Sequence, residues 1–261
     1  MSDNYQLLDC GAGYKLEQVG PYRIKRPAPI AFWQPRLPEK EWQLADFIFS
    51  REKGAHWLKN KAVKPWQVQL ENIRMQVVLT AFGHLGFFPE HQFLWKKLLE
   101  MLEPKMPILN LFAYSGGASL VAAKKQAQVC HVDASKPMVE MAKANAALNQ
   151  ITNIRWIVDD VFKFLKREKR RNAVYAGIIL DPPSFGRGTQ EQVFKIENDI
   201  IELLDACFAL KPSFVIFSCH TPGFTGSVLK QLLNTEDAGE LLLKAHSGLV
   251  LPSGHYAIWR K

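Results

Sequence analysis

The sequence lacks the features of a membrane or secreted protein. None of its apolar runs reaches 18 residues, about the length that a membrane-spanning helix needs. The N-terminal residues 1–5 contain no basic segment followed by an apolar stretch, so we expect no secretory signal. The four cysteines stand far apart and form no CxxC pair, which gives no support to a zinc site or a disulfide framework. We therefore expect a cytoplasmic protein that binds no membrane.

Two ligand-binding patterns are also missing. The seven histidines show neither HxH nor HExxH spacing, so we expect no metal site. The pattern GxGxxG is absent as well, which argues against a nicotinamide-dependent dehydrogenase. What is present is an excess of basic charge, +8 for the 261 residues, with its densest cluster at residues 163–171. This charge is compatible with an acidic partner such as RNA, and a solvated helix end is the alternative interpretation of the cluster.

Residues 1–83 are predicted to form a small β-rich module. Short apolar or alternating runs, such as 22–24 and 76–79, lie between Gly and Pro turn signals. The module is rich in aromatic and basic residues. These side chains could stack on RNA and neutralise it, or they could form the core of the module and dock it on the rest of the chain.

Residues 84–261 are predicted to form an α/β domain. After a helix at 90–102, we expect strands at 108–112, 129–132, 154–158, 176–180 and 214–217, with helices between them. Strands that alternate with helices predict a parallel sheet covered on both faces. Two more strands are expected at 241–245 and 256–259.

The ends of the first three strands carry residues suited to a nucleoside ligand. Ligands of such sheets bind beyond the carboxyl ends of the strands. Gly116 and Gly117 follow the first strand, where glycines let the backbone approach a ligand and the next helix offers N–H groups to a carboxylate. Asp133 ends the second strand and can accept both hydroxyl protons of a ribose. The third strand ends in Asp159-Asp160-Val161, where a carboxylate can accept an adenine amino proton and Val161 can cover the ring.

The fourth strand ends in the string Asp181-Pro182-Pro183-Ser184-Phe185. Paired prolines remove two backbone donors and fix the loop, so that its carbonyls are available to a substrate. A planar base could stack on the Phe185 ring while Asp181 or a proline carbonyl accepts its amino proton. We therefore predict that Asp181, Pro182 and Phe185 are catalytic residues.

With these motifs, the chain from about residue 84 to its end resembles class I S-adenosylmethionine-dependent methyltransferases, specifically the bacterial 23S (large-subunit) ribosomal RNA methyltransferases. The matching segments are 110–117, 132–135, 159–162, 181–185 and 217–220, with a lead-in at 83–90 that resembles the segment covering the cofactor in that family. The N-terminal part resembles a shorter branch without the usual RNA-binding PUA domain.

The resemblance implies a Rossmann-like sheet that is parallel except for an antiparallel C-terminal strand, with S-adenosylmethionine as the cofactor. Two positions depart from the family, since His91 stands where Gln is common and His220 where many relatives have Ser or Thr. The cofactor contacts expected from the motifs and the resemblance together are His84, Phe112, Tyr114, Ser115, Gly116, Gly117, Asp133, Ala134, Ser135, Asp160, Val161 and Asp181.

The most direct function is methylation of a base in ribosomal RNA, at cytosine C5 or at a guanine or adenine nitrogen. C5 methylation needs a nucleophile that adds to the ring, and Cys219 at the end of the fifth strand is the one credible candidate. Methylation of a nitrogen needs only a positioned base and an aligned methyl donor. Two further hypotheses are a methyltransferase of a protein or small molecule, and a cofactor-binding RNA module without turnover.

Overall fold

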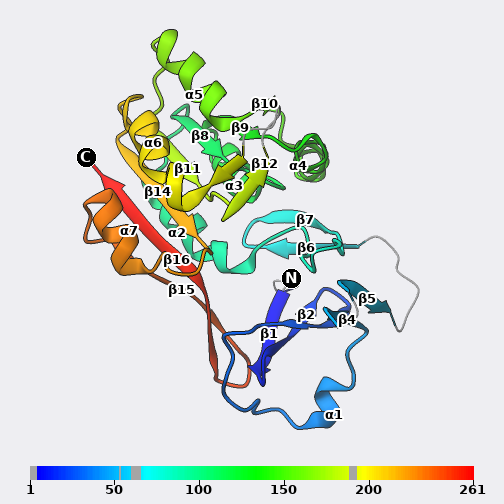
Figure 1. Cartoon of the computed structure of the whole chain (residues 1–261). Coiled ribbons are helices and arrows are strands. Elements are labelled where there is room, and N and C mark those ends of the chain that lie inside the picture. Colours follow the sequence, from blue (N-terminus) through cyan, green and yellow to red (C-terminus); the bar gives the residue numbers. More distant parts are fainter. Residues whose placement is uncertain (1–4, 53, 60–65, 188–192) are drawn as a thin grey trace. The chain divides into compact units, whose positions relative to one another are not determined.

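The computed structural model describes residues 5–52, 54–59, 66–187 and 193–261. The chain forms two compact units, labelled by element in Figure 1. Unit 1 comprises residues 1–92 and 242–253, and unit 2 comprises residues 93–241 and 254–261. Within the described ranges, no helix is long and apolar enough to cross a membrane.

Unit 1 is built on a five-stranded sheet in the order β1-β2-β3-β4-β5. Neighbouring strands are antiparallel except β3 and β4, which are parallel and are therefore joined by a longer connection that contains α1. This sheet confirms the predicted β-rich N-terminal module. The elements are β1 (Tyr5–Gly11), β2 (Tyr14–Val19), β3 (Tyr22–Pro27), α1 (Glu39–Trp42), β4 (Phe47–Ser50), β5 (His56–Lys59), a separate hairpin of β6 (Trp66–Leu70) and β7 (Ile73–Val77), and the 3₁₀ turn η1 (Pro89–His91).

A buried ion pair lies in the middle of this sheet. The Arg26 guanidinium donates two hydrogen bonds to the Glu17 carboxylate, at 2.6 and 2.7 Å, and the Tyr5 hydroxyl donates a third at 3.0 Å. Burial raises the pKa of Glu17, but the positive charges of Arg26 and Lys15 outweigh it and lower the pKa to about 2. Glu17 is therefore ionised, and its charge is balanced inside the protein.

The tip of the C-terminal hairpin belongs to unit 1. Leu243, Ala245 and Leu251 pack against Leu7 and its apolar neighbours. The backbone N–H of residue 246 donates to the Leu7 carbonyl at 2.8 Å, and that of residue 247 to the Leu8 carbonyl at 3.0 Å. The hairpin thus covers the β1 end of the sheet.

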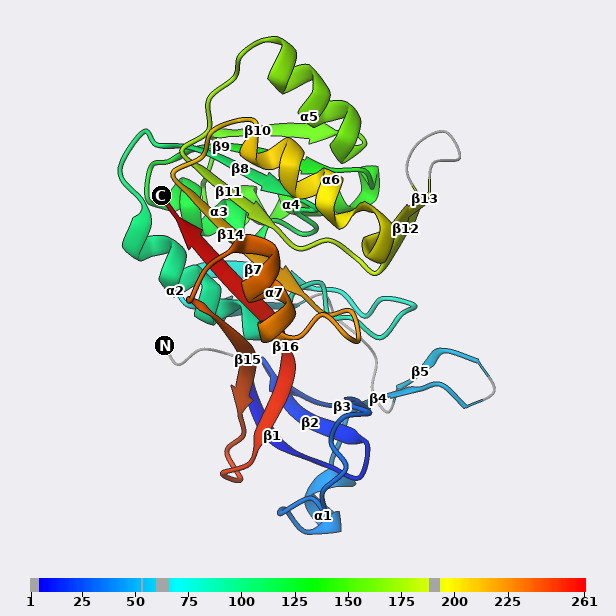
Figure 2. The ribbon, with the colours of Figure 1, turned by 60° about the vertical axis from the view of Figure 1, so that its left-hand side comes forward.

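Unit 2 is a seven-stranded sheet in the order β10-β9-β8-β11-β14-β16-β15, seen from two directions in Figures 1 and 2. The pairs from β10 to β14 are parallel, and β16 runs antiparallel to β14. This order confirms the predicted class I methyltransferase sheet. The chain moves outward from β8 to β10 and then returns to β11 on the other side of β8, so the switch in strand order lies between β8 and β11.

Apart from the hairpin of β12 and β13 and the helix α7, the elements of unit 2 alternate as the apolar runs predicted. They are α2 (Gln92–Met101), β8 (Pro107–Leu111), α3 (Gly117–Lys124), β9 (Gln128–Asp133), α4 (Lys136–Leu148), β10 (Ile154–Val158), α5 (Val161–Arg170), β11 (Gly177–Leu180), β12 (Phe185–Arg187), β13 (Val193–Lys195), α6 (Ile196–Phe208), β14 (Phe214–Cys219), α7 (Gly226–Leu233), β15 (Ala238–Lys244) and β16 (Val250–Arg260). The first residue of α2, Gln92, is the last residue of the first segment of unit 1. The strands β15 and β16 both extend from unit 2 into unit 1.

Alternate residues of β8 show how the two faces of this sheet differ. Leu109 and Leu111 join the apolar core formed with α5, α6 and α7. Asn110 points to the opposite face and donates a 2.9 Å hydrogen bond to the Ser119 hydroxyl of α3. One face is therefore a dry core, whereas the face under α3 contains buried polar groups.

The buried pair in unit 1 leads to a stability prediction. We expect Glu17→Gln to lower the free energy of unfolding by about 3–5 kcal/mol, because it leaves the Arg26 charge buried without a counter-ion. The matched control is Glu140→Gln, which removes an exposed partner of Lys143 at 2.9 Å and should cost less than about 1 kcal/mol. Urea titration would measure both variants, and equal losses would contradict the prediction.

The contribution of Glu17 to the free energy of unfolding depends on pH. The pKa of Glu17 is about 2 in the folded state against an ordinary value of 4.5, so the unfolded chain binds more protons between these values. The stabilisation by Glu17 is thus complete above pH 4.5 and is lost as the pH falls toward 2. The stability difference between wild type and Glu17→Gln should shrink over that range.

Candidate active site

The turn between β8 and α3 has an unusual backbone. Phe112, Tyr114 and Gly116 have φ values of +51°, +49° and +92°, in the left-handed region. This region is costly for residues with a Cβ, and strain of this kind clusters at functional sites. Gly116 is the N-cap of α3, so the turn ends where the first N–H groups of the helix are unpaired.

The two glycines of this turn are required by close packing. A Cβ on Gly117 would lie 2.4 Å from the Trp95 ring, and one on Gly116 would lie 3.1 Å from Ala142. The first distance is too short for any side chain. The glycines let α3 begin directly behind the strand and keep its N-terminus accessible at the carboxyl edge of the sheet.

Asp133, at the end of β9, holds the turn. Its carboxylate oxygens accept hydrogen bonds from the backbone N–H of Tyr114 at 2.9 Å and of Ser135 at 2.8 Å. Burial raises the pKa of Asp133, and these two hydrogen bonds oppose the rise. A carboxylate has about four lone-pair directions, so Asp133 can also accept hydrogen bonds from a ligand. Ala134 and Ser135 follow it and lead into α4, of which Ser135 is the N-cap.

A chain of buried polar groups supports the turn from below. Asn145 of α4 donates to the Ser115 carbonyl at 3.0 Å, which fixes the middle of the turn. The Ser119 hydroxyl lies 3.0 Å from Nδ1 of His131. Burial lowers the pKa of His131 to about 3, so the ring is neutral at neutral pH. The sequence analysis missed His131, Ser119 and Asn145, because residues in a strand or helix interior carry no local sign of such pairing.

Asp160 and Val161 follow the end of β10, and their expected contacts with adenine remain predictions. The Asp160 carboxylate caps α5 by accepting from the N–H of Lys163 at 3.0 Å. Val161 is 4% exposed and belongs to the core beneath the helix. Asp159 forms an ion pair with Arg167 of the same helix. One oxygen of Asp160 is thus occupied by the cap, and the second can accept an amino proton.

The end of β11 brings Asp181 together with β14. The Ser218 hydroxyl donates to Asp181 Oδ1 at 2.8 Å, and Nε2 of His220 lies 3.8 Å from the same oxygen. Pro182 is buried, whereas the ring of Phe185 is 52% exposed. The loop therefore places a carboxylate and an open aromatic face within five residues of each other.

Cys219 has a different environment from its neighbour Ser218. Its side chain is buried in the core shared with α6 and α7, and the N–H of Thr221 lies 3.5 Å from the sulfur. Burial raises the pKa of the Cys219 thiol. The group is therefore protonated at neutral pH in this structure.

The predicted residues of unit 2 gather at one edge of its sheet. The exception is His84, which lies in unit 1, where its ring is 5.3 Å from that of Phe88 and its N–H donates to the Thr80 hydroxyl at 2.9 Å. The expected cofactor contact of His84 remains a prediction.

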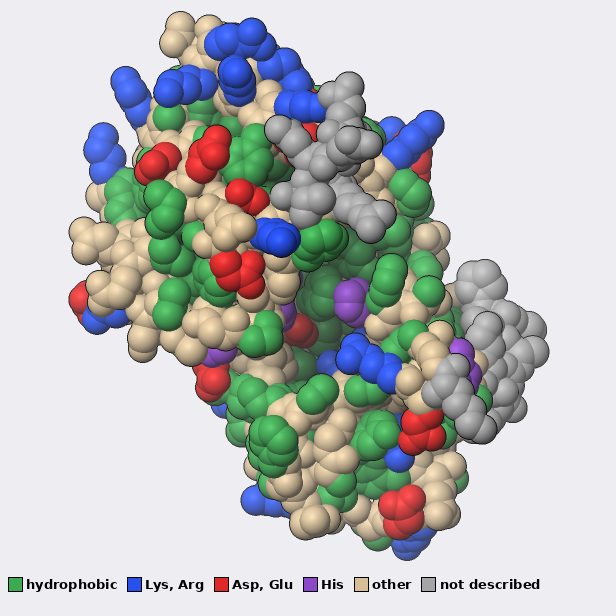
Figure 3. All heavy atoms as spheres, viewed as in Figure 1, with side chains coloured by type: hydrophobic (Ala, Val, Ile, Leu, Met, Phe, Trp, Pro, Cys, Tyr) green, Lys and Arg blue, Asp and Glu red, His purple; other side chains and the backbone are tan. Residues whose placement is uncertain are grey.

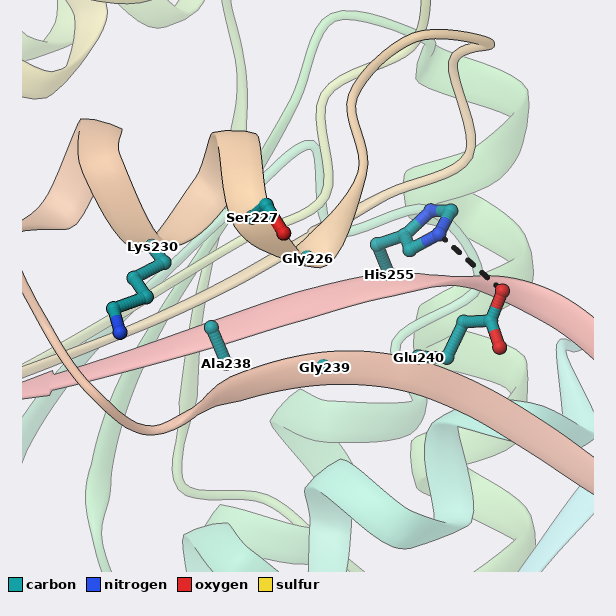
Figure 4. Close-up of a pocket in the computed structure, with 7 residues that line it drawn as sticks. All are labelled: Gly226, Ser227, Lys230, Ala238, Gly239, Glu240 and His255. Carbon is teal, nitrogen blue, oxygen red and sulfur yellow. Dashed lines mark ion pairs between the residues drawn. The ribbon is translucent and has the colours of Figure 1, made fainter.

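A second hollow of unit 2, of about 260 Å³, was not predicted from the sequence (Figure 4). It lies between the start of α7 and β15, where Gly226 and Gly239 meet so closely that a Cβ on Gly226 would lie 3.0 Å from the Gly239 backbone. Nε2 of His255 lies 3.6 Å from Glu240 Oε1, and Lys230 is paired with Glu236. Its charged groups already have partners, and it contains none of the predicted catalytic residues.

Comparison with known proteins identifies the family of this architecture. The family model described as S-adenosylmethionine-dependent methyltransferase matches residues 42–225. This range contains the whole strained turn, Asp133, Asp160 and the Asp181 loop.

Curated relatives are ribosomal RNA methyltransferases of greater length. The ribosomal RNA large subunit methyltransferase K/L of Syntrophotalea carbinolica is 31% identical over 209 residues, which cover 77% of this chain and 28% of that protein. The ribosomal RNA large subunit methyltransferase I of Tolumonas auensis is 37% identical over 134 residues, 50% of this chain and 34% of that protein. The chain thus matches about a third or less of these relatives' length.

Solved structures have the same fold. A SAM-dependent methyltransferase from Agrobacterium tumefaciens is 34% identical, with a TM-score of 0.92 and coverage of 99% of this chain and 91% of that one. A putative methyltransferase in complex with S-adenosylhomocysteine is 19% identical, with a TM-score of 0.76 and coverage of 98% and 75%. The second likeness concerns the fold alone.

The position of Asp133 gives a prediction for cofactor binding. We expect Asp133→Ala to weaken S-adenosylmethionine binding by about 2–4 kcal/mol, roughly 30-fold to 1,000-fold, because hydrogen bonds to a charged group contribute about 1.5–3 kcal/mol each. Calorimetric titration measures the affinity, and circular dichroism checks that the variant is folded. Asp205→Ala, an exposed acid on α6, is the control. Wild-type affinity in the folded Asp133 variant would refute the site.

Proposed function

We propose that this chain methylates a base in ribosomal RNA, because it belongs to the S-adenosylmethionine-dependent methyltransferase family and carries an aromatic, carboxylate-containing loop beside its cofactor edge. The curated relatives named above support the RNA substrate, although each is a longer protein. The proposal includes a cytoplasmic location, where ribosomes are found.

The residues at the sheet edge fit the cofactor. The Asp133 carboxylate can accept hydrogen bonds from the two ribose hydroxyls, the N–H groups at the start of α3 can bind the amino-acid carboxylate, and Asp160 can accept the adenine amino proton. S-adenosylmethionine supplies an electrophilic methyl group carried on a sulfonium. The chain's own contribution is to orient this group and the acceptor base, and to exclude competing acceptors.

The single observation that carries the proposal is the loop after β11. Its Asp181 carboxylate is oriented by Ser218, and Phe185, two residues beyond the prolines, presents a half-exposed ring. Unpaired bases are recognised by stacking on aromatic rings and by hydrogen bonds to their edges. Phe185 can stack on a base and fix its plane, while Asp181 accepts a hydrogen bond from an N–H group of the base. The two contacts together would keep the nucleophilic atom of the base in line with the methyl group.

The charge of α5 supports a polyanionic partner. Figure 3 shows Lys and Arg side chains gathered over this helix, at the top of the view. Arg167 and Arg171 are paired with Asp159 and Glu168. The exposed side chains of 166, 169 and 170 form no ion pair within the described ranges. Three uncompensated cations on one helix attract phosphate groups at low and moderate salt.

An assay with tritiated S-adenosylmethionine tests the function. Unmethylated large-subunit ribosomal RNA, made by transcription in vitro, should incorporate label, and nuclease digestion with mass spectrometry should place it on one base. Labelling of protein or of small molecules, with none in RNA, would contradict the RNA substrate. Binding of the cofactor without any transfer would favour an RNA module without turnover.

Asp181 is the first residue to vary in this assay. We expect Asp181→Asn to lower the single-turnover rate by about 10²–10⁴-fold, because a positioned proton acceptor contributes about this much to a proton transfer. The amide has the same shape, so the folded variant should retain its thermal unfolding temperature. Asp205→Asn is the matched control on the exposed face of α6. A rate within threefold of wild type would remove Asp181 from the mechanism.

Cys219 distinguishes the two acceptor atoms. Because its thiol is buried and protonated, we expect Cys219→Ala to retain at least a tenth of the single-turnover rate, which corresponds to methylation of a base nitrogen. Loss of more than about 10³-fold in a folded variant, with a covalent RNA adduct absent from the variant but present in wild type, would instead show a nucleophilic thiolate and C5 as the acceptor.

A further inference from the structure

Unit 1 contains a small cavity. Its volume is about 190 Å³, and its lining comes from β2, β3, β4 and the segment 82–90. Pockets that enclose whole drug-sized ligands are about 300–1,000 Å³, so this cavity suits one base or one phosphate group rather than a complete cofactor. Every residue that lines it belongs to unit 1.

Lys15 lies at the edge of the buried ion pair and faces this cavity. Its Nζ is 3.6 Å from Glu17 Oε1, and that carboxylate already accepts three hydrogen bonds, two from Arg26 and one from Tyr5. The Lys15 side chain is only 16% exposed. Burial lowers the pKa of Lys15 and the neighbouring Arg26 lowers it further, whereas the carboxylates of Glu17 and Glu90 oppose this shift. An ammonium has three donors, and 3.6 Å is longer than a normal hydrogen bond, so Lys15 retains capacity for an anion.

A second cation lines the cavity from its exposed side. Arg51 makes no ion pair or hydrogen bond with any residue in the described part of the chain, and its side chain is exposed. The guanidinium has five donors in a planar fork that matches a phosphate. Lys15 and Arg51 therefore offer one anionic group a buried and an exposed partner.

Aromatic rings form the rest of the wall. Phe82 lines the cavity and is 75% exposed, so its ring is open to a ligand. Its ring centroid is 6.5 Å from that of His84, which in turn is 5.3 Å from Phe88. Exposed rings beside cations are the combination by which proteins bind single-stranded nucleic acid.

We propose that this cavity binds one unstacked nucleotide of the RNA, with its phosphate on Lys15 and Arg51 and its base on the ring of Phe82. The inference rests on the proposed function and assigns unit 1 a part in holding the substrate. The cavity is also lined by the buried carboxylate of Glu90, which interacts with Lys15 and Arg26. The three cations Lys15, Arg26 and Arg51 outnumber the two carboxylates Glu17 and Glu90, so the wall keeps a net positive charge and favours a phosphate joined to a planar ring over a metal ion.

Fluorescence anisotropy with the full-length protein tests this site. The probe is a fluorescein-labelled single-stranded RNA of twelve nucleotides, and its dissociation constant is measured at several salt concentrations. We expect Phe82→Ala to weaken binding at least fivefold at all salt concentrations, through loss of stacking. Arg51→Ala should weaken it by a similar factor and reduce the slope of log K against log salt by about one.

Matched controls come from the same unit. Phe32 is 86% exposed and lies outside the cavity lining, so Phe32→Ala should bind like wild type. Arg36 is also exposed and outside the lining, and Arg36→Ala tests for a nonspecific effect of charge. All four positions are on the surface, so the variants should keep the wild-type unfolding temperature.

The outcomes separate this site from the proposed function. If wild type binds and methylates RNA while Phe82→Ala and Arg51→Ala match their controls, the cavity is not a nucleotide site but the function stands. If Arg51→Ala alone weakens binding, the cavity takes an anion without a base, and the proposal is overturned. If wild-type protein binds S-adenosylmethionine but no RNA, the proposed function fails and this inference fails with it.

Discussion

The carboxylate of Asp133 is the contact on which the ligand-binding edge of unit 2 depends. It joins the ends of two neighbouring strands, because one oxygen holds the N–H of Tyr114 after β8 and the other holds that of Ser135 before α4. Tyr114 has a left-handed backbone conformation that costs roughly 1–2 kcal/mol, and the hydrogen bond helps to maintain it. The acid proposed to bind the cofactor thus also shapes the turn proposed to receive it, so the local fold and the proposed binding rely on the same buried carboxylate.

Much of unit 2 follows from local pattern. The third strand of the sheet was expected at 154–158 and is observed there, and the other parallel strands agree within one or two residues at most ends, because apolar runs between turn signals are determined by burial on both faces. Two elements were not predicted. The short hairpin of β12 and β13 has three residues in each strand, and α7 has eight residues, although Thr225 as its N-cap is a signal that could have located it.

The remaining features arise from contacts distant in sequence. Nothing near residues 242–253 indicates that this hairpin packs on β1, since its apolar residues Leu243 and Leu251 could cover any sheet. Ser218 and Asp181 are 37 residues apart and meet because β11 and β14 are parallel neighbours. The strand-end motifs therefore located the acids of the proposed site at one edge of the sheet, whereas the groups that orient them depend on strand order and register.

The ion cluster of unit 1 is difficult to explain by stability alone. Burying Glu17, Arg26 and Lys15 costs desolvation energy, and apolar residues of similar volume would often give an equally stable or more stable sheet. Arg26 and Glu17 are joined by two hydrogen bonds. Lys15 faces the cavity and makes a longer contact with the Glu17 carboxylate, which already accepts the hydrogen bonds of Arg26. An anion that arrives with the substrate would offset the cost of Lys15, and for that reason the cluster is better understood as half of a binding site than as part of the core.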